Sequence, residues 1–330
     1  MDFPRLQLLL ISTVLLAAHI VLLDFELPMT WVLVVVTFGC MFWHAWWILP
    51  YTKIWPKEVR GSTDSDPSLS ISILTANVLT PNRNSEALLE LVSKLKPDIL
   101  ATLESNDWWQ VRLDSLEEEM PYSVKCPQDN LYGMHVYSRL PLSDIEVSNL
   151  VEEDVPSIHT LVTLRNGVCL GLHVLHPAPP SPTENNESIE RDAELVLVAR
   201  STAESELPTI VAGDLNDVAW SSTTRLFRKI SGLLDPRIGR GLFNTFHAGY
   251  PLVRWPLDHL FHSPHFTVSS IKRLPPIGSD HFPLYATLKL DGKPESNSLG
   301  LESAATDRAR ADSIVRQPSD RPADVPTPGE

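Results

Sequence analysis

The sequence has few cysteines, and this scarcity argues against two kinds of site. The three cysteines are Cys40, Cys126 and Cys169, and they stand apart without the spacing of metal ligands. Neither a disulfide framework nor a cysteine-bound zinc ion fits this usage. The chain is therefore expected to depend on a hydrophobic core, and its length of 330 residues with 43% hydrophobic content is sufficient for one.

The sequence also lacks an excess of positive charge and any internal repeat. It has 27 Lys and Arg residues against 41 Asp and Glu residues, for a net charge of −14. Proteins that bind nucleic acid without sequence preference usually carry a broad basic surface. The charge balance argues against tight, sequence-independent DNA binding, whereas acidic groups can collect metal ions.

Apolar sequence, by contrast, is abundant near the start of the chain. Residues 6–23 and 29–51 are two apolar runs without a full charge, and each is long enough to cross a bilayer as a helix. We predict a transmembrane hairpin over residues 1–52, anchored in an inner or plasma membrane. A cleaved signal peptide is the alternative for the first run, but the second run follows at once and favours the hairpin.

Charged residues beside the two runs predict the orientation of the hairpin. Arg5 precedes the first run, and Lys53, Lys57 and Arg60 follow the second. The positive-inside rule then places both ends, and the remainder of the chain, in the cytoplasm. These are few charges, so a periplasmic or extracellular domain stays as the alternative.

The rest of the sequence is predicted to comprise a linker, one folded domain and a tail. Residues 53–68 mix charge, Gly, Ser and Pro, which is typical of a linker. Residues 69–291 alternate many β-rich runs with few helical patterns, which favours an α+β sandwich of sheets with outer helices over a doubly wound fold. Residues 292–330 have almost no bulky apolar side chains, and we predict a disordered tail.

Polar side chains stand at the ends of the predicted strands. They are Asn77, Glu104, His176, Asp214, Asn216, Asp258, Asp280 and His281. Any one of them has a simple structural explanation, as a solvated strand end, a turn cap or a hydrogen-bonded histidine. Together they supply oxygen ligands for a hard cation such as Mg²⁺, a base for a water molecule and donors for a phosphate group. This set predicts metal-assisted hydrolysis of a phosphate ester.

The motifs that contain these residues are "TANV", "LES", "HPAP", "GDLND", "LDHLF" and "SDHFP". In this order they resemble the endonuclease/exonuclease/phosphatase superfamily, whose members are similar to deoxyribonuclease I and abasic-site endonucleases. Four-residue motifs recur by chance, so the evidence is their ordered co-occurrence over residues 69–290. The resemblance implies a four-layer α/β-sandwich with its site at the rim of two packed sheets.

The resemblance also implies a metal site. Glu104 and Asn77 match the metal-binding pair of the family, and Asp280 lies near the same metal. The metal implied is Mg²⁺, with Mn²⁺ able to substitute for it.

Further positions of the resemblance imply catalytic and phosphate-binding roles. Asp214 would orient or deprotonate the attacking water, and Asn216 would hold the phosphate. His281 would contact the scissile phosphate and, with Asp258, carry out acid/base work. His176 would bind the phosphate and assist the leaving group.

Three nearby features are predicted to be structural. His173 does not fit the motif spacing, and Asp217 is predicted to cap the helix that follows it. Residues 245–256 are predicted to form a rim loop, in which Phe246 and Trp255 could stack on a base or sugar but are more simply explained by local packing.

We therefore predict a membrane-tethered, Mg²⁺-dependent phosphoesterase that uses water as its nucleophile. The motifs do not choose among nucleic acid, a lipid headgroup and a small phosphate ester; an acidic domain at a bilayer favours the last two modestly. No protein partner is inferred. The rival hypothesis is a catalytically inactive binding or scaffolding module, against which the presence of every motif residue argues.

Overall fold

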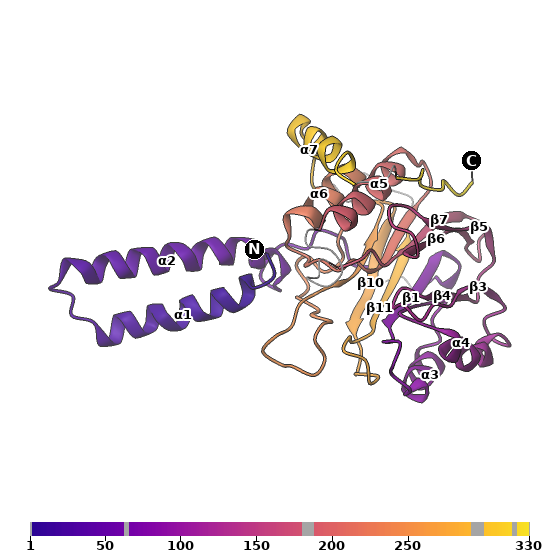
Figure 1. Cartoon of the computed structure of the whole chain (residues 1–330), viewed down its shortest axis with the longest axis horizontal. Coiled ribbons are helices and arrows are strands. Elements are labelled where there is room, and N and C mark those ends of the chain that lie inside the picture. Colours follow the sequence, from indigo (N-terminus) through magenta and orange to yellow (C-terminus); the bar gives the residue numbers. More distant parts are fainter. Residues whose placement is uncertain (1, 63–65, 180–187, 292–299, 319–321, 330) are drawn as a thin grey trace.

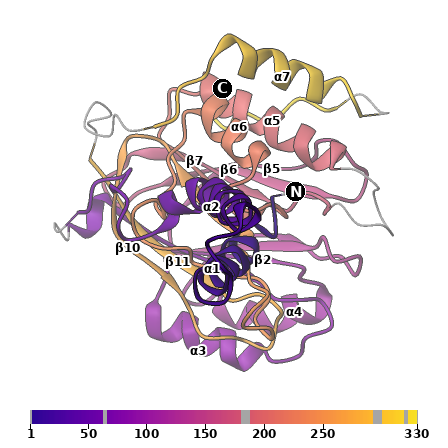
Figure 2. The same ribbon diagram turned by 90° about the vertical axis from the view of Figure 1, so that its left-hand side faces the viewer.

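The computed structural model describes residues 2–62, 66–179, 188–291, 300–318 and 322–329. Two long helices project from one side of a domain built on two β-sheets (Figure 1). Viewed along the projecting helices, the domain separates into stacked layers, with helices on both outer faces (Figure 2).

The projecting helices are α1 (Arg5–Leu22) and α2 (Pro28–Ile48), which form an antiparallel hairpin. α2 begins at a proline, whose missing N–H costs nothing in the first turn of a helix. Both helices are long and apolar enough to cross a membrane, and only 6% of the apolar window of each is buried. The two predicted spans are thus confirmed as exposed apolar helices by length and composition.

The first sheet has six strands in the order β10-β11-β1-β2-β4-β3. Its strands are β1 (Ser70–Asn77), β2 (Ile99–Leu103), β3 (Tyr122–Cys126), β4 (Met134–Ser138), β10 (Phe266–Arg273) and β11 (Leu284–Leu290). The second sheet has five strands in the order β5-β6-β7-β8-β9. Its strands are β5 (Leu142–Asn149), β6 (Pro156–Thr163), β7 (Cys169–Leu175), β8 (Thr209–Asp214) and β9 (Asp258–His262).

The remaining helices lie outside the sheets. They are α3 (Ser85–Leu95), α4 (Asp107–Leu113), α5 (Ile189–Glu204), α6 (Ser222–Ser231) and α7 (Ala305–Val315), with short 3₁₀ turns η1 (Leu49–Tyr51), η2 (Pro67–Leu69) and η3 (Asp114–Leu116). α3 and α4 pack on the first sheet, and α5 and α6 pack on the second.

The main core lies between the two sheets and follows from alternation along the strands. In β1, Ile71 and Ile73 point into the core between the sheets, whereas Leu74 packs under α3 and α4. Successive side chains of a strand point to opposite faces, so both faces of the central strands must be apolar. The result is the predicted α+β fold, a four-layer sandwich of helices, sheet, sheet and helices.

The predicted linker packs against the domain over its described part. Val59 is fully buried, and buried Glu58 forms an ion pair with Arg228 of α6. The Ser62 amide donates to the carbonyl of Val268 over 3.0 Å. Composition predicted a linker, and in the structure Glu58, Val59 and Ser62 fix its described part to the domain.

The prediction of a disordered tail over residues 292–330 is wrong for α7. This helix packs on α5 and α6 through Ala311 and Ile314, which join a small cluster of buried apolar residues. Lys229 of α6 also contacts Asp307 at 3.0 Å. Two apolar residues on one face suffice because a partner surface is present. Residues 292–299, 319–321 and 330 of the tail lie outside the described residues.

Candidate functional site

The strand ends bring the predicted residues to one rim of the sandwich. Asn77 is the last residue of β1, and Glu104 directly follows β2. β1 and β2 are parallel, so their carboxyl ends lie at the same edge of the first sheet. In the second sheet, Asp214 ends β8, and His176 directly follows the parallel strand β7.

Two further residues enter this rim at the beginnings of antiparallel strands. Asp258 is the first residue of β9 and lies directly opposite Asp214 in the register of the second sheet. His281 lies just before β11, which runs antiparallel to β1. The topology therefore places both residues at the edge that the parallel strands reach with their carboxyl ends.

His281 lies between two carboxylates. Its Nδ1 donates to Oδ2 of Asp258 over 2.8 Å, and its Nε2 is 3.3 Å from Oδ2 of Asp214. Burial would lower the pKa of His281, but the charges of Asp258 and Asp214 raise it to about 10. Burial raises the pKa of Asp258. At neutral pH the imidazole is positively charged, and it joins the two sheets electrostatically.

Asp214 is held in its ionised form despite burial. Burial would raise its pKa, but the charge of His281 and two hydrogen bonds lower it. The backbone N–H of Asn216 donates to Oδ1 over 2.9 Å, and Nδ2 of Asn77 donates to Oδ2 over 3.3 Å. A buried carboxylate with a low pKa suits acceptance of a hydrogen bond from water.

Glu104 has an oxygen that the described residues leave without a partner. Oε1 accepts from Nδ2 of Asn77 over 2.7 Å, whereas the buried Oε2 has no hydrogen bond among the described residues. Burial raises the pKa of Glu104 to about 7, and the charges of Asp214 and Asp280 contribute to the rise. A buried, unpartnered carboxylate oxygen near other carboxylates fits a divalent cation.

Asn77 differs from its predicted place in the metal site. Its amide oxygen accepts from the backbone N–H of Leu79 over 3.1 Å, and its nitrogen donates to Glu104 and Asp214. Carboxylates cannot donate, so this orientation follows from the hydrogen bonds. Asn77 therefore positions two carboxylates in this structure.

A second group of potential metal ligands consists of Asp214, Asp258 and His281, whose ligand atoms lie within 4.8 Å of one another. Both ring nitrogens of His281 face carboxylate oxygens. A protonated imidazole already compensates the charges of the two carboxylates, so these three residues do not need a metal ion to balance them.

The loop after β8 needs two unusual backbone conformations. Gly213 has φ +142°, and a Cβ there would lie 2.0 Å from the carbonyl oxygen of Leu175. Asn216 has φ 51°, a left-handed conformation that asparagine tolerates. Its Nδ2 donates to the carbonyl of Pro177 over 2.9 Å, and its own carbonyl accepts from Arg191 over 2.8 Å.

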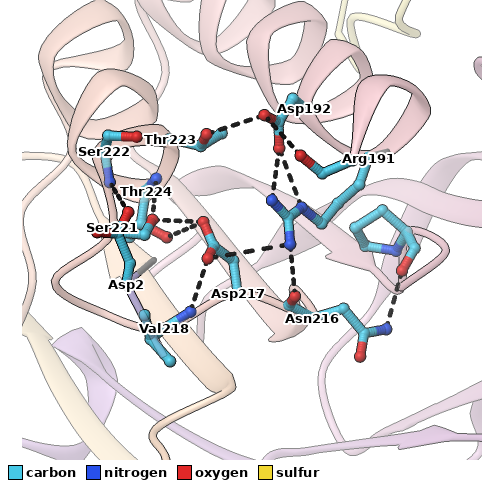
Figure 3. A network of polar contacts seen from close by, with 12 residues as sticks. Asp2, Arg191, Asp192, Asn216, Asp217, Val218, Ser221, Ser222, Thr223 and Thr224 are labelled. Atoms are coloured by element: carbon cyan, nitrogen blue, oxygen red, sulfur yellow. Dashed lines mark hydrogen bonds and ion pairs between the residues drawn. The ribbon is translucent and has the colours of Figure 1, made fainter. Parts of the chain in front are cut away.

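Asp217 lies behind this loop in a polar network (Figure 3). It accepts from the hydroxyls of Ser221 and Thr224. The helix cap is Ser221, whose Oγ accepts from the N–H of Thr224 over 2.8 Å. The prediction that Asp217 caps the helix is therefore wrong, because the chain turns once more before α6 begins, and Asp217 orients the cap instead.

His176 and His173 occupy different environments. The ring of His176 lies 5.5 Å from that of Tyr132, and burial lowers its pKa to about 4, so it is uncharged at neutral pH. Its buried Nδ1 has no partner among the described residues. His173 pairs with His159 at 2.7 Å inside the second sheet, consistent with the predicted structural role.

The rim loop contributes contacts that sequence reasoning did not assign. Phe246 lies 4.9 Å from the ring of His281 and stacks on Trp255 at 6.2 Å. The hydroxyl of Thr245 accepts from the N–H of Asp258 over 3.1 Å. The aromatic side chains thus pack on the rim, in agreement with the prediction of local packing. No motif in the sequence indicates a role for Thr245.

Comparisons with known proteins concern the family and the fold of this chain. The sequence model of a family described as Endonuclease/Exonuclease/phosphatase family matches residues 74–281. No curated protein matches the chain by sequence.

Solved structures with similar folds come from several organisms. TDP2 from D. rerio, crystallised with a single-stranded DNA product, has a TM-score of 0.55 at 18% identity over 67% of this chain and 99% of that chain. The human nocturnin catalytic domain with bound sulfate has a TM-score of 0.56 at 17% identity over 68% and 96%. An endonuclease/exonuclease/phosphatase from Beutenbergia cavernae has a TM-score of 0.52 at 16% identity over 67% and 72%. At these identities the likeness concerns the fold.

Proposed function

Because the chain belongs to the endonuclease/exonuclease/phosphatase family, we propose that it is a metal-dependent hydrolase of a phosphodiester or phosphomonoester. The observation that carries this proposal is the meeting of the two sheets at Asp214. Its Oδ2 lies 3.3 Å from Nδ2 of Asn77 and 3.3 Å from Nε2 of His281. An ionised carboxylate lies beside an imidazolium, and the unpartnered oxygen of Glu104 is nearby. This arrangement suits a reaction in which negative charge develops on a phosphate.

Glu104 and Asp280 would hold the metal ion. This ion would be Mg²⁺, for which Mn²⁺ could substitute. The unpartnered Oε2 of Glu104 supports this role, and the Asn77 amide would keep Glu104 in position. A bound divalent ion supplies Lewis-acid neutralisation of the phosphate charge.

The remaining residues would move protons and bind the phosphate. Asp214 accepts a proton from water as the water oxygen attacks phosphorus and the ester oxygen leaves. His281, charged and held by Asp258, would share its Nε2 proton between Asp214 and a phosphate oxygen. Asn216 has a second amide N–H for the phosphate, and neutral His176 stabilises the leaving oxygen by hydrogen bonding.

The helices α1 and α2 would tether this domain to a membrane. Their exposed apolar surface supports a bilayer environment. The charges at Arg5, Lys53, Lys57 and Arg60 support a cytoplasmic domain. A reporter fused after residue 291 should behave as cytoplasmic; a periplasmic or extracellular signal would reverse the orientation.

The test of catalysis uses the full chain in detergent micelles with a chromogenic phosphodiester, a phosphomonoester and plasmid DNA. Turnover should require Mg²⁺ or Mn²⁺ and stop with a chelator. Asp214→Ala and His281→Ala should each lose about 10²- to 10⁴-fold in kcat/KM. Glu118→Gln, an exposed position in the turn before β3, serves as the control.

Two outcomes would contradict the proposal. If no phosphate ester is hydrolysed in a metal-dependent manner, the domain is a binding or scaffolding module. If turnover persists in both variants, the rim described here does not carry out the chemistry.

A further inference from the structure

The loop of residues 247–254 exposes apolar side chains on the side of the domain from which the helical hairpin projects. Tyr250 is 62% exposed, Leu252 85% and Val253 43%. Figure 1 shows this orange loop extending toward α1 and α2. Nε2 of Gln7, in the first turns of α1, reaches the carbonyl oxygen of Leu252 at 3.4 Å. The exposed tip is therefore continuous with the apolar surface of a candidate membrane span.

A crevice of about 250 Å³ separates this loop from α1. Its apolar lining comprises Leu6 and Leu10 of α1 and Pro251 and Leu252 of the loop. Arg254 and Arg273 also line it. A crevice lined by both apolar and cationic residues matches the amphipathic character of a lipid near its headgroup.

The two arginines share an aromatic neighbour and have no carboxylate partner among the described residues. Both stack on Phe282, with ring distances of 4.9 Å for Arg254 and 4.4 Å for Arg273. Their hydrogen bonds go to backbone carbonyls, and neither forms an ion pair with a carboxylate among the described residues. Burial and the charge of Arg254 lower the pKa of Arg273. An anion bound in the crevice that both residues line would offset these positive charges.

The crevice is connected to the candidate catalytic site by direct contacts. Phe282, on which both arginines stack, follows His281 in the chain. On the other side of the loop, Phe3 lies 5.9 Å from Trp255, which stacks on Phe246, and Phe246 contacts His281. The beginning of the hairpin is thus two aromatic rings away from the catalytic histidine.

We propose that the crevice binds the anionic headgroup of a membrane phospholipid while the tip at Leu252 enters the bilayer surface, and that the substrate is a phosphate ester carried by such a lipid. The substrate assignment rests on the proposed hydrolase function, whereas the binding site does not. Interfacial insertion of apolar side chains together with basic residues is a general mode of attachment to anionic membranes. Because the chain has a net charge of −14, a pair of arginines without carboxylate partners among the described residues stands out from the rest of its charge distribution.

The first experiment measures binding without catalysis. The full chain, purified in detergent, is mixed with phosphatidylglycerol, phosphatidylcholine or inorganic phosphate, and bound ligand is counted by native mass spectrometry. We expect retention of phosphatidylglycerol at least tenfold above phosphatidylcholine, and loss of this preference in Arg254→Gln/Arg273→Gln. The control Arg112→Gln/Arg308→Gln removes the same charge from exposed positions on α4 and α7 and should keep the preference.

The following binding results would contradict the proposal. Equal retention of both lipids, or an unchanged preference in the arginine double variant, would overturn the binding site. Saturation by inorganic phosphate that displaces the lipid would show a free-phosphate site and overturn the lipid assignment. Because Arg254 supports the loop backbone, the single variant Arg273→Gln is measured as well; a folded Arg273→Gln that retains the full lipid preference also counts against the site.

The second experiment tests the substrate class in nanodiscs that contain phosphatidylglycerol. Turnover of the lipid is compared with turnover of a soluble phosphodiester and of single-stranded DNA. Leu252→Asp should lower the ratio of lipid to soluble turnover at least tenfold, mainly through KM. Hydrolysis of DNA or the soluble ester without hydrolysis of lipid would overturn the lipid substrate but leave the hydrolase intact. Absence of hydrolysis of every ester would instead contradict the proposed function.

Discussion

Metal binding by this protein should depend on the protonation of Glu104. Burial raises the pKa of this carboxyl group from 4.5 to about 7. A carboxylate must lose its proton before it binds a cation, so metal binding should release a proton in this range. A pKa of about 7 makes the apparent dissociation constant for Mg²⁺ about tenfold larger at pH 6 than at pH 8. The affinity for the metal falls as the pH drops through the raised pKa of Glu104, because the protonated carboxyl group does not bind the cation.

The size of this change distinguishes Glu104 from its neighbours. A carboxyl group with the ordinary pKa would be ionised at both pH values, and the affinity would change by only about a few per cent. The pKa of Asp214 is lowered, that of His176 is lowered to about 4 and that of His281 is raised to about 10. These three groups therefore keep their protonation states between pH 6 and pH 8.

Isothermal titration calorimetry of the full chain with Mg²⁺ or Mn²⁺ at the two pH values measures this effect. Asp258→Asn is the control, because Asp258 is the other carboxyl group at the site with a raised pKa. We expect the tenfold change in the wild type and in this control, and weaker, pH-independent binding in Glu104→Gln. The reasoning would be refuted by equal wild-type affinities at both pH values, or by a tenfold change that survives in Glu104→Gln.

Three other perturbations test the structure. Gly213→Ala should destabilise the fold by about 3 kcal/mol, because its Cβ would meet the carbonyl of Leu175 at 2.0 Å; an unchanged Tm in detergent would contradict the close approach. Arg228→Met should cost about 3–5 kcal/mol by leaving buried Glu58 unpaired, and Arg228→Met/Glu58→Met should recover much of the lost Tm. Asp258→Asn should move the alkaline limb of kcat/KM to lower pH, because Asp258 raises the pKa of His281, which loses its positive charge above that pKa. An unmoved limb would show that catalysis does not depend on the charge of His281.

The layers of the fold and the residues of the rim could be predicted from the sequence. Alternating apolar residues ended in polar ones at Asn77 and Asp214, and a strand that ends in a polar residue delivers it to a sheet edge. The prediction that residues of the two sheets meet at one site rested on the family resemblance of the ordered motifs. Spacing along the chain alone does not give distances between sheets. The ion pair at Glu58 and the helix at Ala305–Val315 could not be predicted, because each depends on a partner surface built elsewhere.

Orientation of individual side chains was the least predictable part of the site. Asn77 matches a metal-binding position in the motif, yet the Leu79 N–H takes its amide oxygen and turns its nitrogen toward the carboxylates. Asp217 likewise has the composition of a helix cap, but Ser221 reaches the free N–H first. Both outcomes depend on where a neighbouring backbone donor points, which local composition does not encode.

The packed segment after the second helix limits the reach of the domain. A flexible chain of about 16 residues, the length of residues 53–68, would let the domain wander by about 22 Å. Here Glu58 is tied to Arg228, and the Trp255 indole donates to the carbonyl of Phe3 over 2.6 Å, so the domain is fastened at two points. In a membrane such fastening would set the catalytic rim at one height above the surface. The distance of a phosphate group from the bilayer would then decide whether it reaches the rim, whatever the chemistry of the rest of the substrate.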